Sequence, residues 1–308
     1  MRLLTIGSVA FDNIETPFGK AEGIVGGAAT FIAHSASKFG TQVNLCAVIG
    51  EDFPQSEIDE LVAAGTNIDG LERVKGEKSF SWTGKYHLDM NTRDTIATDL
   101  NVLANFDPTL PEHYRDSEYV MLGNLTPTVQ LSVLNQLKSP KFVAMDTMNF
   151  WIEIALEDLK KVFERVDMLM INDQEARLIT GEYSLRKAAR IIQALGPKFL
   201  IIKKGEHGAM LFHGERMFFC PALPLEDIFD PTGAGDSFAG GFMGYLARTN
   251  DLSWENLKRA LVYGSCVASF SVEKFGVERI KQLTRREIDN RMMEFFALIQ
   301  FDAAHHLK

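Results

Sequence analysis

Short apolar runs typical of buried strands alternate with helical patterns along most of the chain. The first run, residues 3–9, closes on a Gly-Ser turn, and Gly26-Gly27 opens a helix that stops at Gly40. A second strand is expected at 43–49 and a helix at about 55–64. Strands and helices in this order form a parallel sheet covered by helices. The sequence therefore predicts an α/β fold with a central, mostly parallel sheet flanked by helices.

The same alternation resumes at residue 119. We expect strands at 119–122, 142–145, 168–171, 199–202, 209–212 and 217–219, and helices after Pro127 and at about 152–165, 174–180 and 185–195. The C-terminal third is mainly helical. Because no repeat, low-complexity tract or long linker interrupts the pattern, we expect one α/β domain over residues 1–308.

Residues 79–105 break this rhythm. Aromatic or β-branched residues alternate there with polar ones, and turn candidates stand at Gly84 and at 89–91, which predicts antiparallel strands. We interpret the segment as a small β appendage inserted into the α/β domain. The alternative is an extra hairpin packed on the edge of the main sheet.

The charge balance argues against some classes of partner. With 32 Lys and Arg against 41 Asp and Glu the formal charge is −9, so the net field repels nucleic acid and anionic membranes, and an anionic substrate needs a local positive site.

Three distant cysteines without CxxC spacing favour reduced thiols over a disulfide framework or a zinc site. The first residues lack a signal-peptide pattern, and no apolar run reaches about 18 residues. We expect a cytoplasmic protein.

Residues 230–242, DPTGAGDSFAGGF, combine a turn of small residues with a helix start. Gly233, Ala234 and Gly235 leave space against the backbone, and a helix beginning here points unpaired N–H groups and its positive dipole end out of the turn, which suits a phosphate. Asp236, in the first turn, suits a base that removes a proton from a hydroxyl attacking that phosphate. The simpler interpretation is a helix start with an ordinary first-turn acid.

The whole thirteen-residue string resembles the C-terminal signature of the ribokinase-type (PfkB) carbohydrate kinase family, D-[TP]-T-G-A-G-D-x-F-x-x-G. The resemblance implies a ribokinase-like α/β domain with a β-stranded lid over the sugar site, here formed by about 12–24 and 79–105. A lid excludes water from the site. In several relatives it also forms a dimer contact, so a homodimer through the lid is implied as well.

Other positions match the family in the same order along the chain. Asp12, in the opening G-x-x-x-x-D, and the pair Gly26-Gly27 resemble substrate-contacting residues. The segment Asn172 to Glu175 resembles N-x-x-E, whose acid organises Mg²⁺ and its waters. Alone, each has a simpler interpretation, such as a turn cap for Asp12, or a helix cap and first-turn acid for the second motif.

Two positions depart from the family pattern. Phe31 stands where an Asn of GGxxxN usually binds the sugar, which puts that contact in doubt. In KKGEHG, which resembles the strand and turn bordering the nucleotide, Lys203 replaces the usual Thr of T-x-G. The lysine either adds a phosphate contact or only changes the strand end.

The resemblance implies a complete set of site residues. They are Asp236, Gly233, Ala234 and Gly235 for catalysis; Asp12, Gly26, Gly27 and Phe31 for the acceptor; Asn172, Lys203, Gly205, Thr232, Gly233 and Gly235 for ATP; and Glu175 for Mg²⁺ through water. Strand-end positions add Asn124 and Asn149 as weaker acceptor contacts.

These residues predict an ATP-dependent kinase that transfers the γ-phosphoryl group to a hydroxyl, most simply a primary alcohol, of a sugar or ribonucleoside, with Asp236 as base. ATP and Mg²⁺ are the implied cofactors, and the resemblance leaves room for a monovalent cation. Phe31, Trp82 and Trp151 favour an aromatic acceptor slightly. The alternative from another class is a non-catalytic regulator that binds a sugar or nucleotide on a kinase fold. A dehydrogenase is disfavoured because no GxGxxG follows the first strand.

Overall fold

Nine strands form one large sheet, in the order β13-β12-β11-β10-β9-β8-β1-β4-β5, and four others form a separate small sheet. The computed structural model describes residues 1–300. The large sheet consists of β1 (Arg2–Ile6), β4 (Gln42–Gly50), β5 (Thr66–Val74), β8 (Tyr119–Leu122), β9 (Phe142–Asp146), β10 (Met168–Asn172), β11 (Phe199–Lys203), β12 (Ala209–His213) and β13 (Arg216–Cys220). Neighbours from β5 to β11 are parallel, and β12 and β13 are antiparallel. The predicted fold class is confirmed.

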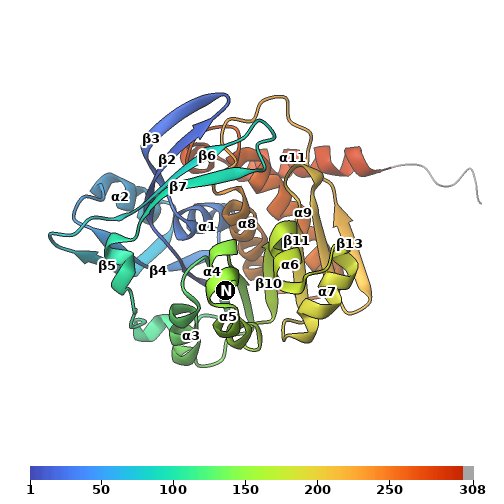
Figure 1. The fold of residues 1–308 in the computed structure, drawn as a ribbon, viewed down its shortest axis with the longest axis horizontal. Coiled ribbons are helices and arrows are strands. Elements are labelled where there is room, and N and C mark those ends of the chain that lie inside the picture. Colours follow the sequence, from blue (N-terminus) through green and yellow to red (C-terminus); the bar gives the residue numbers. More distant parts are fainter. Residues whose placement is uncertain (301–308) are drawn as a thin grey trace, which may run out of the picture.

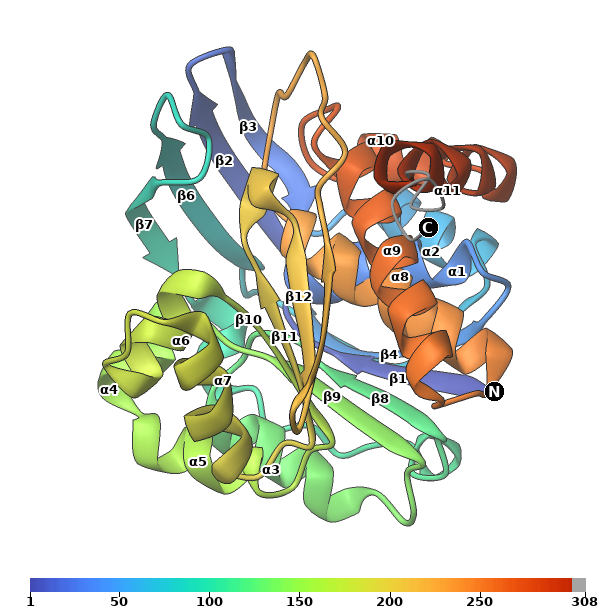
Figure 2. The same ribbon diagram turned by 90° about the vertical axis from the view of Figure 1, so that its right-hand side faces the viewer.

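Helices cover both faces of this sheet (Figures 1 and 2). They are α1 (Ala28–Ser37), α2 (Gln55–Ala63), α3 (Pro127–Gln136), α4 (Asn149–Ile154), α5 (Leu156–Phe163), α6 (Asp173–Thr180), α7 (Leu185–Ala194), α8 (Ala234–Thr249), α9 (Trp254–Ser271), α10 (Glu278–Gln282) and α11 (Arg285–Ile299). Strand residues alternate between two cores: Leu3 packs with α1, α8 and α9, whereas Leu4 packs with α3, α5 and α7. Both faces of the sheet are therefore buried, as parallel strands require.

The strand order reverses between β1 and β8, because the chain goes from β1 outward to β4 and β5 and later returns on the other side of β1. In an open α/β sheet, ligands bind outside the carboxyl ends of the strands at such a reversal. The carboxyl ends of β9, β10 and β11 lie on the same edge, since Asp146 pairs with Met170, and Asn172 with Lys203. This edge positions the site described below.

The small sheet has the order β3-β2-β6-β7 and is built from the two expected segments. Its strands are β2 (Ala10–Thr16), β3 (Gly19–Gly26), β6 (Phe80–Tyr86) and β7 (Arg93–Asp99). It is a sheet of its own beside the α/β layers (Figure 2), so the edge-hairpin alternative is wrong. Gly84, expected in a turn, lies within β6 at a shift of register with β7, and the reversal occupies residues 87–92.

The main differences from the predicted elements concern the first strand, an additional edge strand and one helix. The first strand stops at Ile6, and β5 adds an edge strand that the sequence pattern did not indicate. The helix expected at 152–165 is two helices, because Ala155 has non-helical backbone angles (φ −140°, ψ 31°). The buried residues Ile152 and Leu159 are seven apart, which fits one continuous helix, so periodicity could not reveal the break.

Helix α8 lies close against α1 and α9 because its contact residues are glycines. A Cβ on Gly244 would lie 2.7 Å from the Cα of Ala36 in α1, and one on Gly240 would lie 2.5 Å from the Ile32 carbonyl oxygen. A Cβ on Gly264 of α9 would lie 2.9 Å from the carbonyl oxygen of Phe238 in α8. Only glycine permits this approach, which fixes the position of α8 and hence of its N-terminus.

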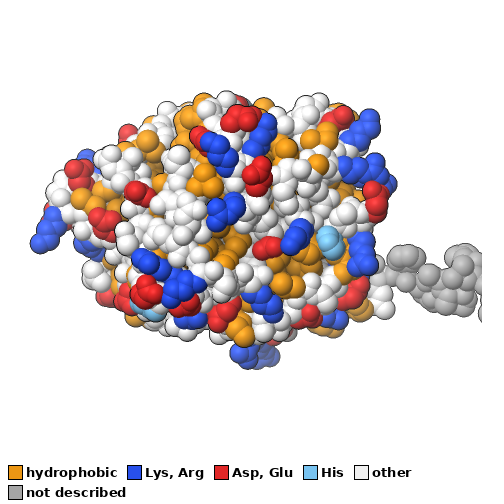
Figure 3. Space-filling view, turned by 90° about the horizontal axis from the view of Figure 1, so that it is seen from below, with side chains coloured by type: hydrophobic (Ala, Val, Ile, Leu, Met, Phe, Trp, Pro, Cys, Tyr) orange, Lys and Arg blue, Asp and Glu red, His pale blue; other side chains and the backbone are white. Residues whose placement is uncertain are grey.

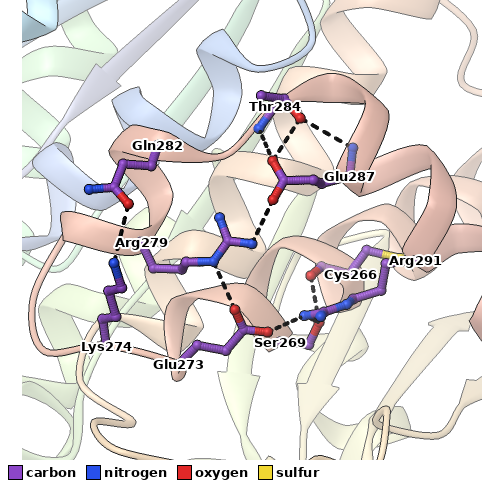
Figure 4. Close-up of polar contacts among 9 residues, drawn as sticks. All are labelled: Cys266, Ser269, Glu273, Lys274, Arg279, Gln282, Thr284, Glu287 and Arg291. Carbon is purple, nitrogen blue, oxygen red and sulfur yellow. Dashed lines mark hydrogen bonds and ion pairs between the residues drawn. The ribbon is translucent and has the colours of Figure 1, made fainter.

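A network of ion pairs joins α9, α10 and α11 (Figure 4). The carboxylate of Glu273 accepts hydrogen bonds from Arg279 (2.8 Å) and Arg291 (2.7 Å), and Arg279 also donates to Glu287 (2.9 Å). Both guanidinium groups lie over the ring of Phe270, at 4.6 and 3.5 Å from its centroid. Such stacked arginines stabilise partly desolvated helix contacts, and here they hold the segment that follows α9.

The surface in Figure 3 intersperses Lys and Arg with Asp and Glu, so this face presents no extended positive patch among its described side chains. Cys46, Cys220 and Cys266 are buried free thiols. Across residues 1–300, every helix is too short or too polar to cross a bilayer.

Substituting Gly244 by Ala tests the α1–α8 approach. Because the added methyl meets backbone atoms of Ala36, the variant should lose about 1 to 2 kcal/mol of unfolding free energy even though Ala favours helix. Urea unfolding followed by circular dichroism measures this. Arg248→Ala, on the exposed face of the same helix, should change stability by less than about 0.5 kcal/mol. Equal stability of wild type and Gly244→Ala would contradict the close packing.

Candidate active site

The turn before α8 has the geometry of an anion site. Gly233 is the N-cap of the helix with φ 72°, a left-handed conformation, and a Cβ there would collide with the ring of Phe31. The N–H of Ala234 donates to the carbonyl oxygen of Pro231 at 3.2 Å. Within residues 1–300, no hydrogen bond engages the N–H groups of Gly233, Gly235 and Asp236. These free donors and the positive helix end can bind an oxyanion.

Asp236 lies in the first turn of α8 beside these donors. Burial, together with the negative charge of Asp146, raises the pKa of its carboxyl to about 7, although Lys203 and Arg93 oppose the shift. A carboxyl that titrates near neutral pH suits general-base work. The arrangement can therefore accept a proton next to a bound oxyanion.

A buried ion pair lies across from this helix end. The ammonium of Lys203, at the end of β11, is 2.7 Å from Oδ2 of Asp146, at the end of β9, and the two side chains are 17% and 8% exposed. A Cβ on Gly235 would lie 3.0 Å from the same ammonium nitrogen. The ammonium thus lies directly against the turn, where it can contact an anion bound to the free N–H groups.

Glu175 closes the group of buried charges. Asn172 and Glu175 form a capping box at the start of α6: Oδ1 of Asn172 accepts the Glu175 N–H at 2.8 Å, and Oε2 of Glu175 accepts the Asn172 N–H at 2.7 Å. The helix-cap interpretation of this motif is therefore correct as local structure. Burial and the charge of Asp146 raise the pKa of Glu175 to about 7.

Asp12 and the glycine pair form the other side of the site. Asp12 on β2 is 4% exposed, and its carboxylate lies against Gly26. Burial and the charges of Asp230 and Asp236 raise its pKa to about 8. A buried carboxyl without a cation beside it suits hydrogen bonds to the hydroxyls of a bound molecule.

Asp230 connects two loops beneath the site. It is fully buried, and its oxygens accept the N–H of Thr232 at 2.8 Å and the N–H of Gly276 at 3.0 Å. The turn before α8 is therefore fastened to the segment after α9, which the arginine network of Figure 4 holds.

The small sheet contacts both sides of the site. Thr232 donates to the hydroxyl of Tyr86 at 3.1 Å, and at the tip of the β6–β7 hairpin the side-chain amide of Asn91 lies against Gly205 and 3.5 Å from Glu206. Arg93, at the start of β7, places a positive charge that lowers the pKa of both Glu175 and Asp236. One hairpin thus reaches from the turn before α8 to the turn after β11.

The remaining sequence-predicted residues lie at different depths. Phe31 is 1% exposed beneath Gly233. Asn124 is committed to its neighbours, because its amide accepts from Trp151 at 3.1 Å and contacts the sulfur of Met148. Asn149 is exposed at the start of α4.

The structure also shows charged groups that sequence reasoning missed. Asp146 directly follows an expected strand, so its strand-end position was a usable signal. Arg93 had none, since only the folded hairpin brings it to the site. No group of three His, Cys, Asp or Glu within the described chain is placed to bind a metal directly, and a metal held through water at Glu175 requires no such group.

Known proteins resemble this chain over most of its length. Residues 8–282 match the model of the pfkB family carbohydrate kinases. The chain is 34% identical over 255 residues to a cytidine kinase of Thermococcus kodakarensis, covering 81% of this chain and 90% of that protein.

Two solved structures share the fold. The nucleoside kinase of Methanocaldococcus jannaschii superposes with a TM-score of 0.77 at 20% identity, over 95% of this chain and 98% of that one. An Escherichia coli protein assigned provisionally as ribokinase II, in complex with ATP and Mg²⁺, superposes with a TM-score of 0.76 at 19% identity, over 95% and 99% of the two chains.

The raised pKa of Asp12 predicts a dependence of stability on pH. Between the ordinary Asp pKa of 3.8 and the raised pKa of about 8, the folded protein keeps a proton that the unfolded chain loses, so stability falls as pH rises through this window. Asp12→Asn removes that loss and should gain, relative to wild type, about 2 kcal/mol or more of unfolding free energy between pH 5 and pH 8.5.

Urea unfolding of the ligand-free protein at the two pH values measures this gain. Asp227→Asn, at an exposed loop position, serves as control and should show no pH-dependent difference. Parallel stability curves for Asp12→Asn and wild type would mean that Asp12 is ionised in the folded protein.

Proposed function

The chain belongs to the pfkB family of carbohydrate kinases, and from this premise we propose that it is an ATP-dependent nucleoside kinase. It transfers the γ-phosphoryl group of ATP to a primary hydroxyl of a ribonucleoside. The observation that carries the proposal is the position of Asp236: a half-buried carboxyl with a pKa near 7 in the same turn as free N–H donors. Phosphoryl transfer to an alcohol needs a base and an anion site in this relation.

In the proposed reaction, Asp236 accepts the proton of the acceptor hydroxyl as its oxygen forms a bond to the γ-phosphorus. The bond between that phosphorus and the β–γ bridging oxygen breaks, and ADP leaves. The N–H groups of Gly233, Gly235 and Asp236 and the ammonium of Lys203 stabilise the charge on the transferred group. Fixed donors of this kind need no rearrangement during the reaction.

The residues present also fit a bound Mg²⁺. The carboxylates of Asp146, Glu175 and Asp236 exceed the single buried ammonium of Lys203, and both Glu175 and Asp236 have raised pKa values in part because of Asp146. This excess of negative charge suits a divalent cation, which Glu175 would hold through water. When bound, Mg²⁺ supplies charge neutralisation for the phosphates.

We assign the small sheet as a lid. Asp12 on β2 contacts acceptor hydroxyls, and the β6–β7 hairpin contacts Thr232 on one side and Gly205 and Glu206 on the other. The lid therefore borders acceptor and nucleotide together, and its closure excludes water from the transferred group.

Two observations support a ribonucleoside as acceptor. The cytidine kinase of Thermococcus kodakarensis, at 34% identity, aligns over most of both chains. Phe31, which stands at the usual sugar-binding Asn, is buried under Gly233, so one polar contact to a free sugar is missing. Asp12 remains for the ribose hydroxyls.

An acceptor panel tests this proposal. With ATP and Mg²⁺, the protein should phosphorylate one or more of cytidine, uridine, adenosine and inosine with a kcat/KM at least about tenfold above those for ribose and fructose, because each lost contact of about 1.4 kcal/mol is a factor of ten. Coupled ADP release and product mass spectrometry measure it. A preference for free sugars would mean that the acceptor is a sugar and not a ribonucleoside. If no acceptor is phosphorylated, the non-catalytic binder is favoured.

Asp236→Asn tests the base. The variant keeps the size of the side chain and removes its basicity, so kcat should fall by about 10²- to 10⁴-fold. For wild type, kcat/KM should decline as pH falls below about 7, where Asp236 becomes protonated. ATP affinity should persist, because the anion site consists of backbone N–H groups and loses a nearby negative charge.

Glu255→Gln is the matched control, since Glu255 is the first-turn acid of α9. It should change stability by about 0.3 to 1 kcal/mol through the helix dipole and leave kcat unchanged. If Asp236→Asn behaves like this control, Asp236 is a helix-dipole acid and the mechanism is wrong.

A further inference from the structure

Lys203 and Asp146 form the most buried ion pair that the site contains. Their 2.7 Å contact joins the ends of β11 and β9 across β10, where Asn172 pairs with Lys203. Burial alone would lower the pKa of Lys203, but the carboxylates of Asp146 and Glu175 raise it above the usual value, so the ammonium stays charged. A buried pair of this kind adds little net stability compared with apolar residues of the same volume.

Charged groups face this pair from every element around it. Glu175 on α6 and Asp236 on α8 are negative, and Arg93 on β7 is positive. Lys203 is the one cation enclosed among the carboxylates of Asp146, Glu175 and Asp236 in the described chain. Its ammonium therefore has alternative negative partners within the same space.

The ammonium also lies at the anion site itself. A Cβ on Gly235 would be 3.0 Å from its nitrogen, and the N–H groups of Gly235 and Asp236 have no partner within residues 1–300. An oxyanion on those donors would therefore be next to Lys203. A lysine side chain carries a compact charge on a flexible four-carbon stem, so its ammonium can reach a second partner without backbone movement.

We propose that Lys203 and Asp146 form an exchangeable ion pair. In the ligand-free protein Asp146 is a positioning residue that holds the Lys203 ammonium beside the turn. When ATP binds, the ammonium leaves Asp146 and forms an ion pair with the terminal phosphate. This inference rests on the proposed kinase function and adds to it a competition between Asp146 and phosphate for one cation.

The exchange predicts opposite effects for the two partners. Lys203→Met removes a charged donor to the phosphate, so binding of a non-hydrolysable ATP analogue should weaken by about tenfold or more. Asp146→Asn removes the competitor and a negative charge near the phosphate, so the same binding should strengthen by about threefold or more. If the pair is fixed, Asp146→Asn instead removes the group that holds the ammonium in place, and binding of the analogue weakens.

Isothermal titration calorimetry of the full chain with the analogue AMP-PNP measures this binding. EDTA removes Mg²⁺, so that an effect of Asp146 on metal binding does not alter the measured affinity. Lys198→Met is the matched control: it makes the same substitution just before the other end of β11, where the side chain is 73% exposed, and it should not change the affinity. Lys203→Arg keeps a cation and should retain more of the affinity than Lys203→Met.

The outcomes separate the two proposals. Opposite shifts in Lys203→Met and Asp146→Asn support the exchange. If both variants weaken binding while wild type binds the analogue and phosphorylates an acceptor, the pair is fixed and only this inference is wrong. A wild type that does not bind the analogue overturns the kinase proposal and this inference together. If Lys203→Met does not fold, analogue binding is compared between Lys203→Arg and Asp146→Asn instead. Binding by Asp146→Asn that is unchanged or weaker than that of wild type overturns the exchange.

Discussion

Carboxylates enclosed in a small space around one ammonium are the constraint on which the site depends. Asp146, Glu175 and Asp236 come from β9, α6 and α8, and Lys203 from β11. Removed from water, like charges raise one another's pKa, and the pKa values of Glu175 and Asp236 rise to about 7 for this reason as well as through burial. The same excess of negative charge that raises the pKa of Asp236 toward neutral pH also attracts cations, so the base strength proposed for Asp236 and the proposed Mg²⁺ site have one electrostatic origin.

The fold holds these charges in place by close backbone packing away from the site. Glycines of α8 let it approach α1, which fixes where its N-terminus points, and Asp230 fastens the preceding turn to the segment after α9. The arginine pair on Phe270 in turn immobilises that segment. The free N–H donors therefore belong to a turn with few remaining degrees of freedom, as transition-state stabilisation by fixed dipoles requires.

The sequence was sufficient for what local pattern determines. Alternating apolar runs predicted the parallel sheet, and the string around Asp236 predicted the turn, because small residues and a first-turn acid act on the backbone next to them. Contacts between distant segments were not predictable in this way. Arg93 reaches the site only through the hairpin, Phe31 lies beneath Gly233, and the break at Ala155 follows α4, whose Trp151 donates a hydrogen bond to the distant Asn124. Periodicity reports which face of an element is buried, but not which partner covers it.

The separateness of the small sheet has a consequence for how such a protein diversifies. Within residues 1–300 its four strands share no ladder with the nine-strand sheet, so substitutions in β2 or β3 leave the strand pairing that positions Asp146 and Lys203 intact. Natural substitutions in the small sheet can therefore change which alcohol is bound while the residues proposed for phosphoryl transfer stay the same. With the small sheet as the proposed lid, a gene duplicate of this chain can change its acceptor side by substitutions in β2 and β3 while the nine-strand sheet stays the same.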